Sequence, residues 1–224
     1  IDKLNKYFKT NEKGFICELN NFVFELPLLG QFNISNALAA YSSLKSLGYN
    51  DAEVIPALSK LLPPLGRMQK LNESNIWIDY AHTPDALINA LKTLKDHYPD
   101  SKIRVLFGCG GDRDKTKRQL MGKIASENAH SIIITNDNPR SENPEQIIND
   151  ILAGIKVEND FQVILNRKKA ITSAVTTLGE DEVLLIAGKG HETTQTIGSQ
   201  ILPFNDIEVA LNALIWYSIS RQTS

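Results

Sequence analysis

The sequence is poor in cysteine and has no long apolar run. Its two cysteines, Cys17 and Cys109, lie far apart and outside any C-x-x-C pattern, which argues against a disulfide framework and a structural zinc site. No apolar run approaches the length of a membrane-spanning helix, and the N-terminus lacks the charged-then-apolar form of a signal peptide. These absences predict a cytoplasmic protein of a reducing compartment, without a membrane partner.

An excess of positive charge is also absent. The 24 Lys and Arg residues are balanced by 26 Asp and Glu residues, for a formal net charge of -2. Nucleic acid is therefore disfavoured as the main partner, because binding a phosphate backbone needs a concentrated basic surface. The 224 residues suffice for one large domain, or for one domain and part of another. Because the chain begins at Ile1 without a Met, we expect a piece of a longer polypeptide.

The first part of the chain combines a hairpin signal with helical spacing. Residues 14–28 alternate in the manner of two short strands joined at Asn20-Asn21. Apolar residues recur at helical spacing over 33–47, with Gly48 as a stop, and a second short helix is expected to have Asp51 as its N-cap. Pro63-Pro64 then forms the best linker signal, which predicts a domain of residues 1–62 and another of residues 63–224.

After this linker, strands and helices alternate. Apolar runs predict strands near 76–79, 103–108, 131–135, 161–165 and 183–187, with helices between them. This alternation is typical of an α/β fold, a doubly wound and mostly parallel sheet. Four of the strands end in polar or glycine-rich segments, 79–85, 108–115, 137–140 and 188–192. Ligands of such sheets bind beyond the carboxyl ends of the strands, so all four segments should meet at one edge.

The most informative of these segments is Asp137-Asn138-Pro139-Arg140. It places a carboxylate, an amide and a guanidinium on one loop, and Pro139 restricts both itself and the preceding residue. Such a loop suits a zwitterionic ligand, because a guanidinium offers a planar fork to a carboxylate. The alternative is an ordinary strand-to-helix loop with a solvated Arg140.

Two further segments combine glycines with charged residues. The segment 108–115 lacks the G-x-G-x-x-G spacing of a dinucleotide fingerprint, yet Arg113, Lys115, Lys117 and Arg118 crowd an expected helix start, where cations are unfavourable. This crowding predicts an anionic partner; a tight turn with solvated charges is the alternative. The segment 188–192 does not match the phosphate-loop pattern G-x-x-x-x-G-K-[ST].

In that last segment Glu192 is suited to a ligand ammonium. His191 is either a general base, a hydrogen-bond donor or a structural residue, and the structural role is favoured. In the segment 79–85, Thr83 is a good N-cap for a helix beginning near Pro84. Asp79 is not needed for capping and is free to hold a ribose hydroxyl. Arg67, just after the linker, either reaches a bound phosphate or is simply solvated.

Taken in order, these segments resemble the Mur ligase family, within it the branch that adds the third residue of the peptidoglycan stem peptide. The matching segments are 29–37, 66–68, 79–85, 107–118, 137–144 and 188–195. The resemblance implies that residues 1–62 are the tail of a central ATP-binding domain and that residues 63–224 are a Rossmann-like C-terminal amino-acid-binding domain. The N-terminal domain, the phosphate loop and a carbamylated lysine of the family would lie outside this sequence, which implies a fragment inactive by itself.

The resemblance also implies a reaction and a set of binding residues. In the family, ATP with Mg²⁺ activates a carboxylate of a UDP-N-acetylmuramoyl dipeptide as an acyl phosphate, and the amine of the incoming amino acid attacks it. Asn33 and Asn36 match positions near adenine, Arg67 a phosphate position, Asp79 a ribose position, and His82 a position facing the nucleotide. The positions matching those that hold the amino acid are Arg113, Asp137, Asn138, Pro139, Arg140, Gly188 and Glu192. No catalytic base and no metal ligand is assigned.

The expected amino acid is meso-2,6-diaminopimelate. It differs from L-lysine by a carboxylate on the far carbon, so its pocket needs a cation there, and Arg140 and Arg113 are candidates. A ligand without the far carboxylate would leave this cation unpaired, and the cost is enough to favour diaminopimelate over L-lysine by about 10³-fold or more. The Asp-Asn-Pro-Arg form is the family's diaminopimelate pattern. The alternatives are a lysine-adding ligase of the same family and an inactive amino-acid-binding module.

Overall fold

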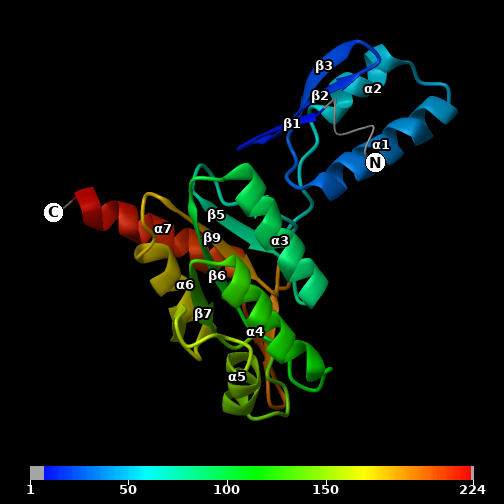
Figure 1. The fold of residues 1–224 in the computed structure, drawn as a ribbon. Helices are drawn as coiled ribbons and strands as arrows, with labels where there is room; N and C mark the ends of the chain where they lie inside the picture. Colours follow the sequence, from blue (N-terminus) through cyan, green and yellow to red (C-terminus); the bar gives the residue numbers. More distant parts are fainter. Residues whose placement is uncertain (1–7, 223–224) are drawn as a thin grey trace. The chain divides into compact units, whose positions relative to one another are not determined.

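The computed structural model describes the backbone of residues 8–222 and the side chains of residues 8–219. The chain divides into two compact units (Figure 1). The first runs to Pro64 and includes Thr93–Pro99, and the second comprises Leu65–Lys92 and the residues from Asp100 onward. Each unit is described by itself below. In the part of the chain that the structure describes, no helix combines the length and apolar character needed to cross a membrane.

The first unit contains a small antiparallel sheet and two helices. Its strands β1 (Phe8–Asn11), β2 (Gly14–Leu19) and β3 (Phe22–Leu26) pair in the order β1-β2-β3. Asn20 and Asn21 join β2 to β3 with φ of 49° and 67°, as a two-residue type I′ turn requires. The predicted hairpin is therefore confirmed.

The helices of this unit are α1 (Gln31–Ser46) and α2 (Asp51–Leu58). The prediction that Asp51 caps α2 is wrong by one residue, because Asn50 is the N-cap and forms a capping box with Glu53. Asp51 is instead the first helical residue and pairs with Lys45 at 2.8 Å. The core of the unit consists of Phe15, Cys17, Leu26, Leu28, Ile34, Ala37, Val54 and Leu58.

The second unit is built on a six-stranded sheet with the order β4-β5-β9-β6-β7-β8. Its strands are β4 (Gln69–Lys70), β5 (Ile76–Asp79), β6 (Lys102–Phe107), β7 (Ser131–Ile134), β8 (Asp160–Val163) and β9 (Glu182–Ala187). Only the short edge strand β4 pairs antiparallel; the other four pairings are parallel. The predicted α/β fold with a mostly parallel sheet is confirmed, and so are its five predicted strands.

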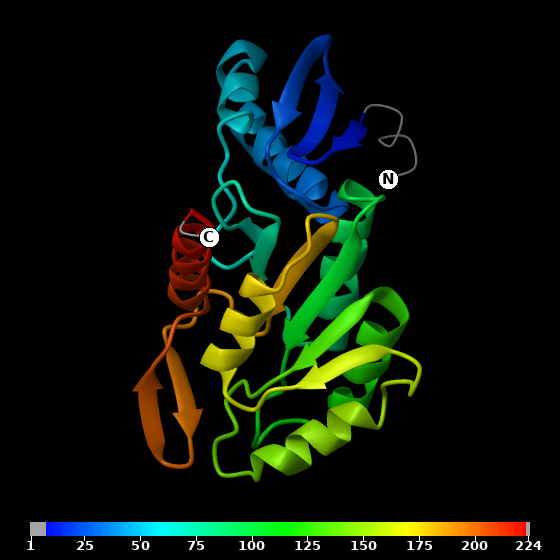
Figure 2. The ribbon, with the colours of Figure 1, turned by 90° about the vertical axis from the view of Figure 1, so that its left-hand side faces the viewer.

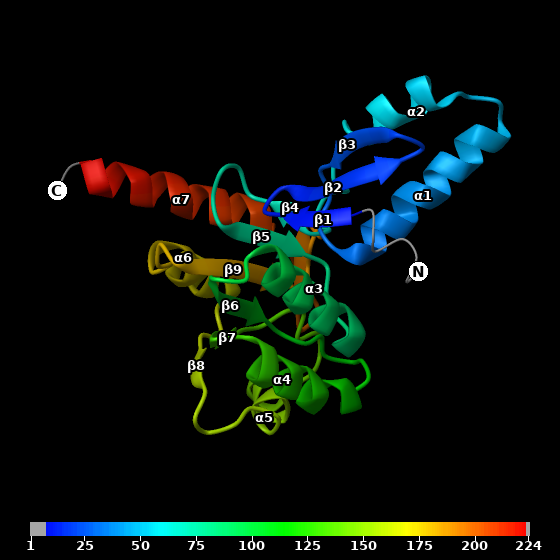
Figure 3. The same ribbon diagram turned by 45° about the horizontal axis from the view of Figure 1, so that its top comes forward.

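Helices cover both faces of this sheet, as Figure 3 shows most clearly. On one side lie α3 (Pro84–His97), α4 (Thr116–Asn128) and α5 (Pro144–Leu152), and on the other α6 (Arg167–Thr176) and α7 (Asp206–Gln222). Thr83 caps α3 as predicted, because its Oγ1 atom accepts a hydrogen bond from Ala86 N at 3.3 Å. Residues of α6 and α7 pack with the sheet in one apolar core that includes Leu106, Ile133, Leu184, Ile186, Ile171 and Ala210.

A second hairpin follows β9 and was not predicted from the sequence. Its strands β10 (Thr194–Ile197) and β11 (Gln200–Pro203) pair antiparallel and form a separate two-stranded sheet (Figure 2, orange). Backbone hydrogen bonds join the hairpin to the segment after β7, from Arg140 N to Thr196 O in β10 at 3.1 Å and from Gly198 N in the turn to Arg140 O at 2.7 Å. The hairpin therefore fixes the position of the Asp137–Arg140 loop.

Candidate functional site

The segments that follow β5, β6, β7 and β9 line one cavity of about 530 Å³ in the second unit. The prediction that these four segments meet at one edge of the sheet is confirmed. Six of the seven residues predicted to hold an amino acid line this cavity, together with one predicted to face a nucleotide: Arg113, Asp137, Asn138, Arg140, Gly188, Glu192 and His82. The seventh, Pro139, is buried in the same loop.

Asp137 has a buried carboxylate oxygen that no donor in the described part of the chain satisfies. The residue is only 9% exposed, and its Oδ2 atom has no hydrogen-bond partner among the described residues. Burial raises the pKa of Asp137 above its ordinary value, although the positive charges of Arg167 and Lys189 act in the opposite direction. A Cβ atom at Gly188 would lie 2.8 Å from this Oδ2 atom. Glycine at 188 therefore leaves room for this carboxylate.

Asn138 and Glu192 are joined by a buried lysine. Lys189 Nζ donates to Asn138 Oδ1 at 3.0 Å and to Glu192 Oε2 at 2.9 Å. Asn138 Nδ2 also donates to Glu192 Oε2, at 3.0 Å. Burial raises the pKa of Glu192, but the hydrogen bonds from Lys189 and Asn138 and the charge of Lys189 outweigh it, so the pKa lies below its ordinary value. Glu192 is thus held as an anion.

Arg140 is held with part of its guanidinium available. Its backbone has a φ of 52°, a left-handed conformation that is uncommon outside glycine. Its Nη1 atom donates to Gly111 O at 2.8 Å, while Nε and Nη2 have no protein acceptor among the described residues. The cavity therefore presents a restrained cation that can still form a bidentate pair with a carboxylate.

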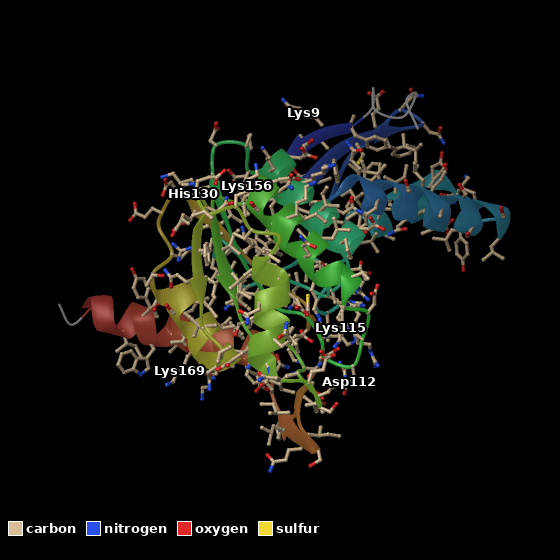
Figure 4. The ribbon with its side chains drawn as sticks, turned by 60° about the horizontal axis from the view of Figure 1, so that its bottom comes forward. Lys9, Asp112, Lys115, His130, Lys156 and Lys169 are labelled. Atoms are coloured by element: carbon tan, nitrogen blue, oxygen red, sulfur yellow. The ribbon has the colours of Figure 1, made fainter. Side chains whose placement is uncertain are left out.

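The loops after β6 and β7 are held together by several direct contacts. Gly111 N donates to Asn138 O at 2.9 Å, and a Cβ atom at Gly111 would lie 1.9 Å from Pro139 O. Asp112 N donates to Glu142 Oε1 at 2.6 Å, and Ser141 Oγ donates to Asp112. Figure 4 shows Asp112 and Lys115 at the end of the sheet where the β10–β11 hairpin lies, with His130 and Lys156 at the other end. These contacts fix the spacing between Arg113 and Arg140.

Some of the cations near the start of α4 are already paired within the protein and are not free to bind an anionic ligand. Arg118 is fully buried and contacts Glu142 Oε1 and Asp150 Oδ2, each at 2.9 Å. Lys115 also pairs with Glu142, at 3.3 Å, and Lys117 Nζ donates to His82 O at 2.8 Å. The prediction of an unfavourable cluster in the first helical turn is therefore wrong for Arg118 and Lys115, whose charges are balanced by carboxylates of the protein. Arg113 remains exposed at the cavity.

The ion pair of Glu142 predicts a specific pH dependence of stability. Hydrogen bonds from Arg118 lower the pKa of Glu142 from 4.5 to about 2. A carboxylate whose pKa is lowered by folding stabilises the protein at every pH above its ordinary pKa. This contribution is lost as the pH falls from 4.5 toward 2. In urea unfolding at a series of pH values, the unfolding free energy of the wild type should fall more steeply over this range than that of Glu142→Gln.

The exposed Glu158 provides the control for this experiment. A Glu158→Gln variant should follow the wild-type pH profile. Parallel profiles for the wild type and Glu142→Gln would contradict the assigned ion pair.

The residues predicted to bind ATP fall into the two units. Asn33 and Asn36 belong to the first, on α1, where Asn33 Nδ2 donates to Leu29 O and Asn36 Nδ2 donates to Asn33 Oδ1. Arg67, Asp79 and His82 belong to the second. The assignment of these five residues to ATP stays a prediction.

Of the second group, Asp79 is the most constrained. Its carboxylate accepts from Met68 N and Ala81 N, each at 2.7 Å, and it is only 9% exposed. It therefore holds the loop that carries Arg67, whose guanidinium lies 4.5 Å from the ring centre of Tyr80. His191 is exposed and its ring lies 5.2 Å from that of Tyr80; its favoured structural role stays a prediction.

Two buried cations of this region were missed by sequence reasoning. Lys189 is fully buried, and Arg167 is 1% exposed and donates to both carboxylate oxygens of Asp206. Gly188 beside it was predicted to hold the amino acid, but Lys189 itself was given no role, and nothing in the sequence marks Arg167. Among the described residues, no group of three His, Cys, Asp or Glu side chains could hold a metal ion.

Comparison with known proteins gives consistent matches. The model of a family described as Mur ligase, glutamate ligase domain matches residues 66–190. The UDP-N-acetylmuramoyl-L-alanyl-D-glutamate--2,6-diaminopimelate ligase of Rickettsia bellii is 46% identical over 211 residues, which are 94% of this chain and 44% of that protein. The ligase of the same name from Coxiella burnetii is 49% identical over 194 residues, 85% of this chain and 40% of that protein.

Solved structures agree with these matches. The structure of a UDP-N-acetylmuramoyl-L-alanyl-D-glutamate--2,6-diaminopimelate ligase is similar with a TM-score of 0.73 and 36% identity, covering 94% of this chain and 45% of that one. The UDP-N-acetylmuramate-alanine ligase from Thermotoga maritima shares the fold, with a TM-score of 0.65 at 21% identity over 96% of this chain and 45% of that one. The chain spans less than half the length of these relatives.

Proposed function

Because the chain belongs to the Mur ligase family, we propose that it is the amino-acid-binding part of an ATP-dependent amide-bond ligase of peptidoglycan precursor synthesis. The proposed reaction adds meso-2,6-diaminopimelate to UDP-N-acetylmuramoyl-L-alanyl-D-glutamate, as the names of relatives 44–49% identical to this chain state. The site for the UDP-linked substrate and the phosphate loop would lie in parts of the protein outside this sequence. The proposed location is the cytoplasm.

The observation that carries the proposed substrate is the pairing of opposite charges in one cavity. The Glu192 carboxylate, with Asp137 lining the same cavity, suits an ammonium group, and the guanidinium of Arg140 suits a carboxylate. A diamino dicarboxylate carries both groups at its far end. An amine must be unprotonated to attack an acyl phosphate, so carboxylates that stabilise an ammonium suit the end of the ligand that does not react.

In this proposal the protein residues act by positioning. Asp137, Glu192 and Arg140 would fix the far end of the amino acid, so that its other amine points away from the floor of the cavity toward the activated carboxylate. Holding two reactants in this way replaces a bimolecular encounter and accounts for much of the rate of such reactions. No general base is assigned.

The domains are proposed along the lines of the family. Residues 1–62 would be the tail of the central ATP-binding domain, and residues 63–224 the amino-acid-binding domain. The division of the chain between Pro64 and Leu65 supports this boundary, whereas the grouping of Thr93–Pro99 with the first unit departs from it.

ATP is the proposed cofactor, and when bound it supplies the phosphoryl group that activates the carboxylate. In the second unit the exposed Arg67 guanidinium suits a phosphate and His82 lines the cavity, and in the first unit the exposed Asn36 amide suits a base. Asp79 fits less well, because its carboxylate is buried and already accepts two backbone hydrogen bonds. Mg²⁺ would need ligands from ATP and from the remainder of the protein, since the described residues offer no cluster for it. No step is therefore derived through the metal.

An L-lysine-adding ligase is the alternative within the family. L-lysine shares the far ammonium but lacks the far carboxylate, so it would leave the half-buried Arg140 guanidinium without an anion. An amino-acid-binding module without ligase activity is the other alternative. Arg140 disfavours the first, and the ordered set of polar segments around the cavity disfavours the second.

The test is an activity assay of the full-length protein to which this chain belongs. With ATP, Mg²⁺ and UDP-N-acetylmuramoyl-L-alanyl-D-glutamate, meso-diaminopimelate should yield an amide product and ADP, and L-lysine should be used at least about 10³-fold less efficiently in kcat/KM. Comparable use of L-lysine would overturn the proposed substrate. An absence of product with either amino acid would overturn the proposed ligase activity.

A further inference from the structure

Lys189 is a charged residue that the proposed reaction leaves without a role. It is fully buried beneath the cavity that Asn138 and Glu192 line. Burying an ammonium group is unfavourable unless it is paired and hydrogen-bonded. Its Nζ atom contacts only Asn138 Oδ1 and Glu192 Oε2 among the described residues. The fold therefore places a buried cation against two residues of the candidate ligand site.

The backbone around Lys189 leaves it little freedom to move out. Gly188 and Gly190 flank it with φ of 116° and 53°, a region that favours glycine. A Cβ atom at Gly190 would lie 2.7 Å from both Gly66 O and Tyr80 Cβ. The turn is thus packed closely against neighbouring backbone, and the side chain of Lys189 points inward at a fixed place.

The first effect of this cation is on the amide of Asn138. Its Oδ1 atom accepts from Lys189 Nζ at 3.0 Å and from Thr196 N at 2.9 Å. Two donors on the same atom require it to be the amide oxygen, because an amide nitrogen does not accept hydrogen bonds. The Nδ2 atom must therefore face Glu192, to which it donates.

The second effect is on the carboxylate of Glu192. Both protein donors, Lys189 Nζ and Asn138 Nδ2, contact the same oxygen, Oε2. The other oxygen, Oε1, has no hydrogen bond from a described residue. Because the side chain is 31% exposed and lines the cavity, Oε1 is available to a ligand.

We propose that Lys189 is a positioning residue for the amino-acid substrate, because it fixes the Asn138 amide and turns one oxygen of Glu192 toward the ligand ammonium. This inference rests on the proposed function and adds to it a residue that touches no substrate. If Lys189 only filled space, a hydrophobic side chain of similar length could take its place. The inference therefore explains why a charged residue is buried here.

The charge of Lys189 has a consequence for pH dependence. The positive charges of Lys189 and Arg140 face Glu192 and favour its anion. The nearby carboxyl of Asp137 carries charge of the same sign as Glu192, and Arg167 is a further cation close to both carboxyls. Removing Lys189 takes away the hydrogen bond and charge that lower the pKa of Glu192. The pKa should then rise, so that the affinity for an ammonium is lost at a higher pH as the solution is acidified.

The test uses Lys189→Met in the full-length enzyme, since methionine keeps the length of the side chain without its charge. KM for meso-diaminopimelate should rise at least about 10-fold, as expected for loss of charged hydrogen bonds, while KM for ATP and for the UDP-linked substrate should stay within about 2-fold. The acid limb of the KM profile for the amino acid should shift to higher pH. Lys115→Met, which removes an exposed lysine outside the cavity lining, should leave all of these values unchanged.

A second variant covers the case in which Lys189→Met fails to fold. Lys189→Gln keeps N–H donors for Asn138 and Glu192 without the charge, so it should raise KM less but shift the acid limb in the same direction. An unchanged KM and pH profile in either folded variant would overturn the inference, and so would an equal rise in KM for all three substrates. If the wild type uses L-lysine instead, the proposed substrate fails, and the same comparison made with L-lysine still decides the role of Lys189.

Discussion

Replacing Arg140 by alanine in the full-length enzyme should lower kcat/KM for meso-diaminopimelate by about 10³-fold or more, because the far carboxylate would lose its charged partner. The guanidinium is half-buried, held by Gly111 O at 2.8 Å, and keeps two nitrogens for a carboxylate. Activity with L-lysine, which has no far carboxylate, should change little or rise. Steady-state kinetics with both amino acids measure the effect.

Two further variants sharpen this experiment. Arg140→Lys keeps the charge but loses the planar fork, so its kcat/KM should lie between those of the wild type and Arg140→Ala. Lys115→Ala removes a nearby cation that does not line the cavity and should have no effect. An equal fall of activity with both amino acids in Arg140→Ala would mean that Arg140 supports the loop and does not select the substrate.

Replacing Arg167 by methionine should lower the free energy of unfolding by about 3–5 kcal/mol, the range for breaking a buried ion pair on one side. Both side chains of the Arg167–Asp206 pair are fully buried, with contacts of 2.8 Å from Nε and 2.6 Å from Nη2. Arg167 Nη2 also donates to Ala187 O at the end of β9. The variant would leave the Asp206 carboxyl without its partner in the interior. Urea unfolding followed by circular dichroism measures the loss.

The matched double variant Arg167→Met/Asp206→Leu tests whether the loss of stability comes from the unpaired Asp206 carboxyl. Removing both charges should recover most of the lost stability, because apolar replacements of buried pairs are often neutral or stabilising. A double variant no more stable than Arg167→Met would contradict this explanation and point to packing around α6 and α7 instead.

Much of the second unit could be predicted because its sheet is buried on both faces. Strands β7 and β9 have no exposed residue, so their sequences are continuous apolar runs that stand out from the helices. Once these strands are known to be parallel, the segments after them must meet at one edge. For this reason the residues of the cavity could be named from the sequence, although their roles remain predictions.

The parts that could not be predicted depend on contacts distant in sequence. The β10–β11 hairpin has one buried residue in its eight, Gln195, so no apolar pattern marks it. Arg118 and Arg167 carry charges that normally lie at the surface, and their carboxylate partners are 24 to 39 residues away. At the start of α2, Asn50 and Asp51 are both good caps in adjacent positions, so composition alone could not choose between them.

The most direct test of the proposed site is a crystal structure of the full-length enzyme with meso-diaminopimelate. The far carboxylate should lie within hydrogen-bonding distance of Arg140 Nε and Nη2, and the far ammonium should contact Glu192 Oε1 beside Asp137, with the other amine directed away from the cavity floor. A ligand bound in this cavity with its far carboxylate distant from Arg140, or bound outside the segments after β5, β6, β7 and β9, would contradict the assignment.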